Sequence, residues 1–569
     1  MWLLALVPAL VAQLAIAPTL LTGQLAGINV DEALHAVYAD AVLHDLAHGD
    51  FHDLLLDITD QVRWPPLGSL LQLPGLLIFG TSEAGHRLAL LLWLLPVAAV
   101  VAWTARQLGA ASAEASHDVA GAATGDRDGE SVCLPAQGLL AAAVAVGLLV
   151  TSRTALIASA SVLYEIPGVG LMLLTYCLAA VAWRRRDTRL FAVAGLALAA
   201  AGFTKWQYGL VTTVALAVPV VFAFRHRSSR LPGVHVAWLF GPAFVLLALW
   251  LASPYHLREI VLYFLWRPAS VETLASNLVK AAVVFARAPL LTQGLTAVTV
   301  AGLVLAVPLL GRPLGLMLMA HLALAMVGSL PKDFSLRTAL WIALPAWAVA
   351  GAGWARAAGR LPRGALVPVA VLVVLLGCGG AGGTAAWVSQ RLVDRGQHAG
   401  LWYRAEAQYL ASTIPFGARL LTVGGWWRFI SPYHIRRQQL LLYWDRPFSL
   451  RALPVTDWPS VEWEPWHLRW KGVRALLGLR RGGPHPPRRR EPPDYVAALY
   501  LPEGNPGVAQ GIQDVAQEFR LVRQSVKTFP TGSRVVLYRC LGKVQKDQDK
   551  AAADSRAEAD RRGRSAPLR

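Results

Sequence analysis

The stretch Gly27-Ile28-Asn29-Val30-Asp31-Glu32-Ala33-Leu34-His35-Ala36-Val37-Tyr38 follows the first hydrophobic segment and decides how the fold is interpreted. It sets two adjacent carboxylates, Asp31 and Glu32, where a membrane segment ends. Carboxylates are costly to desolvate there, so a function or a partner has to hold them. A carboxylate at that boundary can deprotonate a hydroxyl, hold a metal or position a cation. The alternative is a helix start, which favours acidic residues through its dipole and its unpaired N–H groups.

The composition is that of a polytopic membrane protein. Of 569 residues, 55% are hydrophobic and only 15% are charged, with a mean hydropathy of +0.44. The net charge of +18 does not indicate a nucleic-acid partner, because much of the Lys/Arg excess falls in short loops between apolar segments or in the tail. The four cysteines show no metal-ligand spacing, and two lie inside apolar segments, which argues against a disulfide framework.

Apolar runs long enough to span a membrane, or nearly so, predict about eleven transmembrane helices. The first is expected to be a retained anchor rather than a cleaved signal peptide, because it is long enough to span and lacks a basic start. The predicted spans are 2–22, 86–105, 136–151, 160–183, 188–203, 206–224, 234–252, 289–310, 313–330, 336–355 and 364–387.

The distribution of basic residues predicts the sidedness of these spans. With the N-terminus inside, the inside loops include the basic runs at 184–186, 225–230 and 356–363. Most outside connections carry one basic residue each, and the long connection 253–288 is mixed. This is the positive-inside bias of a correct threading, and it places the Asp31-Glu32 loop outside together with everything after residue 388.

The first outside loop, residues 23–85, is expected to be structured. Apolar residues recur at helical spacing from Asp31 to Leu46, which predicts a helix. The run that follows Arg63 and ends at Phe79-Gly80 is too short to span, so it suits a helix lying in the membrane interface.

Three other regions stand apart from the transmembrane domain 1–390. Residues 110–135 form an Ala/Gly/Asp-rich inside insert that is expected to be disordered. Residues 391–544 alternate turn signals with strand-like runs at 419–423, 495–500 and 534–538, which predicts a small extracytoplasmic α/β domain. The charged tail 545–569 is expected to be unfolded.

The order of these features resembles the GT-C glycosyltransferases. The acidic pair after the first span, the Pro-Pro-Leu element at 65–67, Phe79-Gly80-Thr81-Ser82-Glu83-Ala84 with Arg87, the serial spans and the outer domain are similar to the protein-mannosyltransferase-like branch. That branch, glycosyltransferase family 39-like, includes the RgtA/B/C/D-like and aminoarabinose-transferase-like enzymes. The resemblance covers residues 1–390. It implies transfer of a sugar from a polyprenyl-phosphate donor to an acceptor on the outer face of the membrane.

The chemistry of such a transfer fits the candidate residues. The acceptor hydroxyl needs a base. Partial desolvation raises the pKa of a carboxylate towards the value that suits a general base. The resemblance assigns that place to Asp31, as base or site organiser, with Glu32 second. Attack opposite the phosphate would invert the anomeric carbon.

The leaving phosphate needs cations or hydrogen-bond donors. Lys205, Lys332 and Arg337 are candidates for this role, with a snorkelling or interfacial anchor as the alternative. Arg63 and Arg87 flank the interfacial element and could hold a phosphate or contact lipid headgroups. Glu165 takes the place of a second acidic residue, which leaves a divalent metal open.

The sequence also allows two other classes of protein, a transporter and a non-catalytic scaffold. A transporter or flippase for lipid-linked glycans would show internal repeats and broken segments at the bilayer midplane. A non-catalytic scaffold could bind glycans through the tryptophan-rich outer region, although those tryptophans equally suit a membrane belt or a core. A bacterial plasma membrane is the expected location, and the acceptor is left as a lipid, a glycan or a protein.

Overall fold

The protein divides into two compact units, the first covering Met1–Ala399 and the second beginning at Gly400. The computed structural model describes residues 2–22, 30–49, 65–120, 130–225, 232–252, 293–329, 336–398, 404–415, 418–424, 441–442, 493–501, 507–530 and 532–543, with a few single residues between them.

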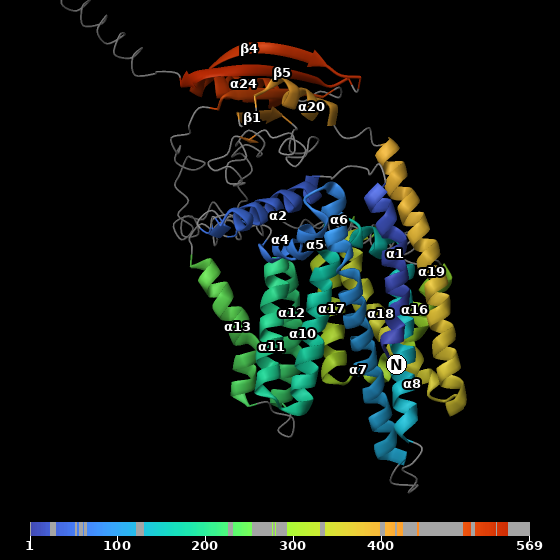
Figure 1. The fold of residues 1–569 in the computed structure, drawn as a ribbon. Coiled ribbons are helices and arrows are strands. Elements are labelled where there is room, and N and C mark those ends of the chain that lie inside the picture. Colours follow the sequence, from blue (N-terminus) through green and yellow to red (C-terminus); the bar gives the residue numbers. More distant parts are fainter. Residues whose placement is uncertain are drawn as a thin grey trace, which may run out of the picture. The chain divides into compact units, whose positions relative to one another are not determined.

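Helices make up the described part of the first unit (Figure 1). They are η1 (Trp2–Leu6), α1 (Val7–Thr22), α2 (Val30–His48), α4 (Leu67–Leu70), α5 (Leu73–Phe79), α6 (Glu83–Leu91), α7 (Leu94–Ala120), α8 (Glu130–Thr151), α9 (Arg153–Ser159), α10 (Glu165–Arg185), α11 (Thr188–Thr204), α12 (Trp206–Arg225), α13 (Gly233–Leu251), α16 (Gln293–Ala306), η3 (Val307–Leu309), α17 (Pro313–Ser329), α18 (Leu336–Ala358) and α19 (Arg363–His398).

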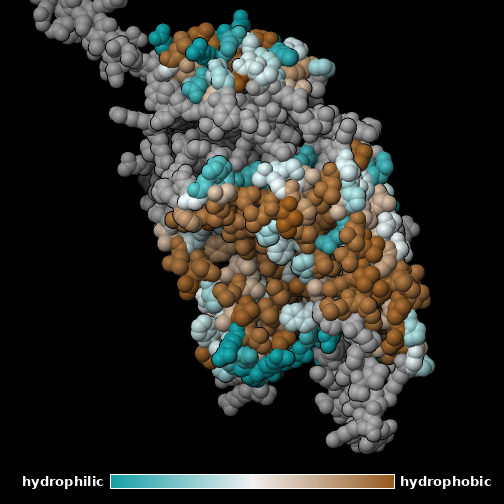
Figure 2. Space-filling model, in the orientation of Figure 1, coloured by the Kyte–Doolittle hydropathy of each residue, from teal (hydrophilic) through white to brown (hydrophobic). Residues whose placement is uncertain are grey.

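The prediction of a polytopic helical membrane protein is confirmed, because every predicted span overlaps a described helix. Among the described residues, six helices are long and apolar enough to cross a membrane. A seventh span results if Ala136–Thr151 and Arg153–Ser159, which meet at a bend of 75°, count as one. Apolar helices such as α11 are shorter, so the count of eleven is not established. Figure 2 shows hydrophobic residues over much of the side of this bundle.

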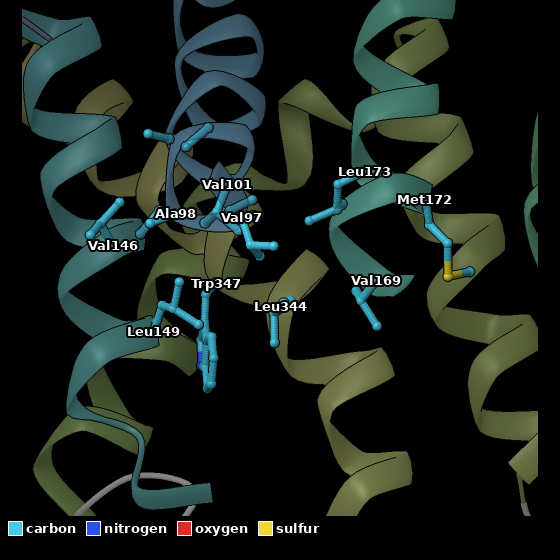
Figure 3. Packing of buried hydrophobic residues seen from close by; sticks show 14 of the residues in the cluster. Val97, Ala98, Val101, Val146, Leu149, Val169, Met172, Leu173, Leu344 and Trp347 are labelled. Carbon is cyan, nitrogen blue, oxygen red and sulfur yellow. The ribbon is translucent and has the colours of Figure 1, made fainter. Parts of the chain in front are cut away.

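The core of the bundle is a layer of small and branched apolar side chains. Figure 3 shows Val97 and Val101 of α7, Leu149 of α8 and Leu344 and Trp347 of α18 within one cluster. Trp347 is only 2% exposed although it is the largest side chain in this layer. Side chains packed this closely make van der Waals contacts that stabilise the association of the helices in the membrane.

Helices α2, α4, α5 and α6 gather at one end of the bundle (Figure 1). The predicted helix from Asp31 to Leu46 is confirmed as α2, and the predicted interfacial element is the pair α4–α5. A left-handed Gly80, with φ of 73°, ends α5 and turns the chain into α6. Because φ is positive there, glycine is the residue that adopts this turn without strain.

The second unit is a small α/β domain, as predicted. It contains α20 (Arg404–Thr413), β1 (Arg419–Gly424), β2 (Leu441–Leu442), β3 (Tyr495–Tyr500), α24 (Gly507–Glu518), β4 (Phe519–Thr528) and β5 (Arg534–Lys543). The strand order is β2-β1-β3-β5-β4, with β1 parallel to β3 and β5 antiparallel to β3 and β4. Successive β1 residues Leu420 and Leu421 belong to two separate clusters, so each face of the sheet has a core of its own.

The sequence correctly predicted β1, β3 and β5 but missed the two-residue strand β2 and the strand β4. Strand β4 carries Arg520, Arg523 and Lys527 and is mostly exposed, so its residues show no apolar run. Helix α7 extends to Ala120 and α8 begins at Glu130, which leaves 121–129 of the predicted insert outside the described residues. The tail 545–569 also lies outside them.

Candidate active site

Helix α6 begins with a local signal that fixes the positions of two charged residues. The side chain of Ser82 is the N-cap and accepts a hydrogen bond of 2.9 Å from the backbone N–H of Gly85. From that start, Glu83 and Arg87 stand one helical turn apart, and the Arg87 Nε donates to a Glu83 carboxylate oxygen over 3.3 Å. The sequence thus sets this pair by spacing alone.

Arg87 also binds Glu32, which is 55 residues earlier in the chain. Its Nη1 lies 3.0 Å from Glu32 Oε1 and 3.1 Å from the carbonyl oxygen of Ala160. The backbone N–H of Val162 donates to the same Glu32 oxygen over 3.0 Å. Glu32 and Arg87 are each 3% exposed. The Glu32 carboxylate therefore joins α2, α6 and the turn after α9 in one buried contact.

One alternative is excluded by this contact. Lipid headgroup contact for Arg87 is wrong, because the guanidinium is buried and paired with two carboxylates. The Glu32 carboxylate accepts hydrogen bonds from α6 and from the turn after α9, so its contacts extend beyond the helix that it begins. A buried charge requires such partners.

A second buried network lies beside the first. His86 Nε2 is 2.9 Å from Asp40 Oδ1, and His86 Nδ1 is 2.9 Å from Gln72 Oε1. The Gln72 amide nitrogen donates to the Tyr164 hydroxyl over 2.9 Å and to the His35 carbonyl over 3.2 Å. Burial raises the pKa of the Tyr164 phenol above its usual range, so the hydroxyl stays protonated. This network ties α2 to the residue before Glu165.

The protonation of His86 follows from its neighbours. A carbonyl can only accept, so the Gln72 nitrogen must face His35 and the Gln72 oxygen must face His86. His86 Nδ1 therefore carries a proton. Its other nitrogen, Nε2, faces Asp40. This contact is buried, since His86 is 0% exposed.

Lys205 and Glu165 form the third polar contact. Helix α11 ends at Thr204, and Lys205 adopts an extended backbone before α12 begins. Its Nζ lies 3.2 Å from Glu165 Oε1 and 5.6 Å from the ring of Tyr208. The Glu165 side chain is buried whereas the Lys205 side chain is a quarter exposed. The cation can thus turn to an anionic ligand without losing all contact with Glu165.

Comparisons with known proteins identify structures with a similar fold. No family model and no curated protein matches the sequence. The structure resembles ArnT from Cupriavidus metallidurans bound to undecaprenyl phosphate, with 15% identity, a TM-score of 0.51 and coverage of 94% of this chain and 97% of that chain. The apo state of ArnT gives the same identity and coverage with a TM-score of 0.54. The chain has the fold of these ArnT structures.

An Archaeoglobus fulgidus oligosaccharyltransferase is also similar, with 11% identity, coverage of 76% of this chain and 63% of that chain, and a TM-score of 0.41. A likeness that remote carries no argument about this molecule. The fold assignment depends on the ArnT structures, and it confirms the predicted fold class of a multi-pass membrane protein with a small C-terminal sheet.

Several residues of the predicted site have side chains that the structure does not describe. Asp31 is in α2 and Arg337 is in α18, but their side chains are not described. Arg63 and Lys332 lie outside the described residues altogether. In the described part of the chain, no group of three or more His, Cys, Asp or Glu could hold a metal ion.

Sequence reasoning missed Asp40, Gln72 and His86. Asp40 lies two helical turns beyond Glu32 on α2, and that spacing was a usable signal because it puts both on one face of the helix. His86 precedes Arg87 and is fully buried in α6. Its partners Asp40 and Gln72 lie in α2 and just before α5, so no local pattern reveals them.

Proposed function

We propose that this chain is an inverting glycosyltransferase that moves a sugar from a polyprenyl-phosphate donor to a lipid, glycan or protein acceptor on the outer face of the membrane. The observation that carries the proposal is the buried contact of Glu32 with Arg87 and the Val162 N–H. That contact holds the start of α2 at the end of the bundle. Asp31, the preceding residue, is then anchored at the same end.

Asp31 is the proposed base. Glu32 is already engaged by a guanidinium and a backbone N–H, so a proton acceptor has to come from elsewhere. In the step, the acceptor O–H gives its proton to Asp31 while its oxygen attacks the anomeric carbon. The bond from that carbon to the phosphate oxygen breaks, and the electron pair leaves with the phosphate. Attack from the opposite face inverts the carbon.

Lys205 is the proposed ligand of the donor phosphate. A charge-assisted hydrogen bond from an ammonium group stabilises the charge that develops on the leaving phosphate. Its partner Glu165 keeps the ammonium in place when the donor is absent. Lys332, Arg337 and Arg63 are proposed as further phosphate ligands, since several donors are needed for a dianion.

The GT-C likeness supports the donor class. ArnT from Cupriavidus metallidurans, which has the same fold, was captured with undecaprenyl phosphate. Polyprenyl phosphates place the reactive carbon at the membrane surface. Glu32, Arg87, Glu165 and Lys205 also lie at one end of the bundle, which suits such a donor better than a soluble nucleotide sugar. We further propose a bacterial plasma membrane with the site on the extracytoplasmic face.

The test is sugar transfer by the purified full-length protein in lipid nanodiscs, with radiolabelled polyprenyl-phosphate sugars. Asp31→Asn should lower transfer by about 10²–10⁴-fold, the usual contribution of a general base. The matched control is Asp187→Asn, at the N-cap of α11, where asparagine caps as well as aspartate. Unchanged transfer by Asp31→Asn would overturn the assignment of the base.

The same experiment separates the alternative classes. A flippase would move labelled lipid across liposomes without joining the sugar to any acceptor. A scaffold would bind glycans without consuming the donor. Either result with the wild-type protein, across a panel of donors and acceptors that includes membrane extracts, would reject the transferase proposal.

A further inference from the structure

A hollow of about 350 Å³ lies between α1 and α19, two of the membrane-spanning helices. These helices run side by side (Figure 1), and α19 has only a fifth of its apolar window buried. The hollow therefore belongs to the outside of the bundle, where the surrounding solvent is lipid. Its lining residues are Ala15, Thr19, Gly382, Ala386, Ser389, Gln390 and Val393.

The hollow is not a by-product of close helix packing. Glycines in membrane helices commonly let two backbones approach, and Gly377 and Gly380 do this, since an added Cβ would meet Pro8 at 3.1 Å and Thr151 at 2.5 Å. Gly382 differs, because a Cβ there would meet no atom within 4 Å. The space beside Gly382 is therefore open to a side chain or to a ligand.

Polar groups line part of this space. Thr19 and Ser389 contribute hydroxyls and Gln390 contributes an amide. The oxygen of Ser389 is buried and has no hydrogen-bond partner among the described residues. Serine hydroxyls in membrane helices usually bond back to a carbonyl one turn earlier, so this one is available to a ligand.

We propose that the hollow binds one acyl chain of a membrane phospholipid, with the ester carbonyls of its glycerol region accepting hydrogen bonds from Ser389 and Thr19. The polar residues are near the ends of both spans, which is the depth at which esters lie. Its volume falls within the range of about 300–1,000 Å³ of small-molecule sites. No lining residue is charged, which suits an uncharged ester rather than the phosphate of a polyprenyl carrier.

The experiment is photo-crosslinking of the full-length protein in nanodiscs that contain a phospholipid with a diazirine in its acyl chain. Labelled peptides are mapped by mass spectrometry. Labelling should concentrate on the peptides of α1 and α19. Gly382→Leu fills the hollow and should lower that labelling about tenfold, a change of ~1.4 kcal/mol in binding.

The matched control is Gly241→Leu in α13. A Cβ at Gly241 also meets no atom within 4 Å, and α13 is a lipid-facing helix, but this residue lines no such hollow. In the Gly241→Leu variant, the labelling of α1 and α19 should equal that of the wild type. Ser389→Ala supplies a second arm that adds no bulk, and it should shorten the residence of the lipid while leaving the fold intact.

Three results would overturn the proposal. Even labelling of α13 and of α1–α19 would show ordinary boundary lipid, and unchanged labelling in both Gly382→Leu and Ser389→Ala would show that the hollow holds nothing. Competition by a polyprenyl phosphate, with no competition by unlabelled phospholipid, would assign the hollow to the donor carrier instead. The readout is independent of sugar transfer, so it stands apart from the test of the proposed function.

Discussion

Arg87 and Glu32 form a buried ion pair, with 3.0 Å between the guanidinium Nη1 and the carboxylate Oε1. The pair connects α6 to the first turn of α2, and the Val162 N–H binds the same carboxylate oxygen from the turn after α9. Three segments that are far apart in sequence are thus fixed at a single oxygen atom. The placement of Asp31 depends on this contact.

Arg87→Ala should destabilise the protein. It leaves the carboxylates of Glu32 and Glu83 buried without their guanidinium, and breaking a buried pair in this way costs about 3–5 kcal/mol. The measurement is thermal unfolding of the purified protein in detergent. Arg87→Lys keeps the positive charge but loses the fork of N–H donors. Its melting temperature should therefore lie between those of the wild type and Arg87→Ala. A melting temperature of Arg87→Ala equal to that of the wild type would contradict the structural role of the pair.

Glu32→Gln and Asp31→Asn should differ in kind. A glutamine oxygen can still accept hydrogen bonds from Arg87 and Val162, so Glu32→Gln should lower stability more than it lowers the rate per folded molecule. Asp31→Asn should do the reverse. The check is the transfer rate normalised to folded protein, together with thermal unfolding. Equal loss of rate in both variants would mean that Glu32 takes part in the chemistry.

Lys205→Ala should raise KM for the donor, because the cation that we assign to the phosphate is removed. Lys205→Arg should restore part of the binding, since the positive charge is kept. Glu165→Gln keeps the Lys205 ammonium group but removes the carboxylate that pairs with it. Its effect on KM should therefore be smaller than that of Lys205→Ala. Steady-state kinetics over a series of donor concentrations measures all three. An unchanged KM in Lys205→Ala would place the phosphate elsewhere.

Asp40 and His86 should show strong energetic coupling. Each single change, Asp40→Ala or His86→Ala, leaves a buried polar group without the partner 2.9 Å away. The double variant removes both groups, so it should cost less than the sum of the two single costs, with an interaction energy of about 0.5–3 kcal/mol. Denaturation of all four proteins provides the cycle. Additive costs would show that the two side chains do not act as a pair.

Gly68→Ala should destabilise the region around Tyr164. An added Cβ would lie 2.2 Å from the Tyr164 ring, which forces the ring or the backbone of α4 to move, and overpacking of this sort costs about 1–3 kcal/mol. The control is Gly241→Ala, whose Cβ meets open space. Thermal unfolding should separate the two variants. If they unfold together, the ring does not pack on Gly68 in solution.

Some features followed from the sequence because their causes are local. Each hydrophobic run overlaps a described helix, and the strand-like runs coincide with β1, β3 and β5. The edge strand β4 was not predicted, because its exposed faces need no apolar pattern. The break before Lys205 was predicted from the gap between two apolar runs, and the structure places the residue at that junction.

The sequence by itself determined that this is a multi-pass membrane protein, and it marked Asp31, Glu32, Glu165 and Lys205 as charges at the ends of spans. Only the tertiary structure decided which charges meet. Pairing of Glu32 with Arg87 and of Asp40 with His86 depends on how separate helices pack, and a one-dimensional pattern carries no information about that distance. Burial then sets the outcome, because a charge removed from water must find its partner nearby.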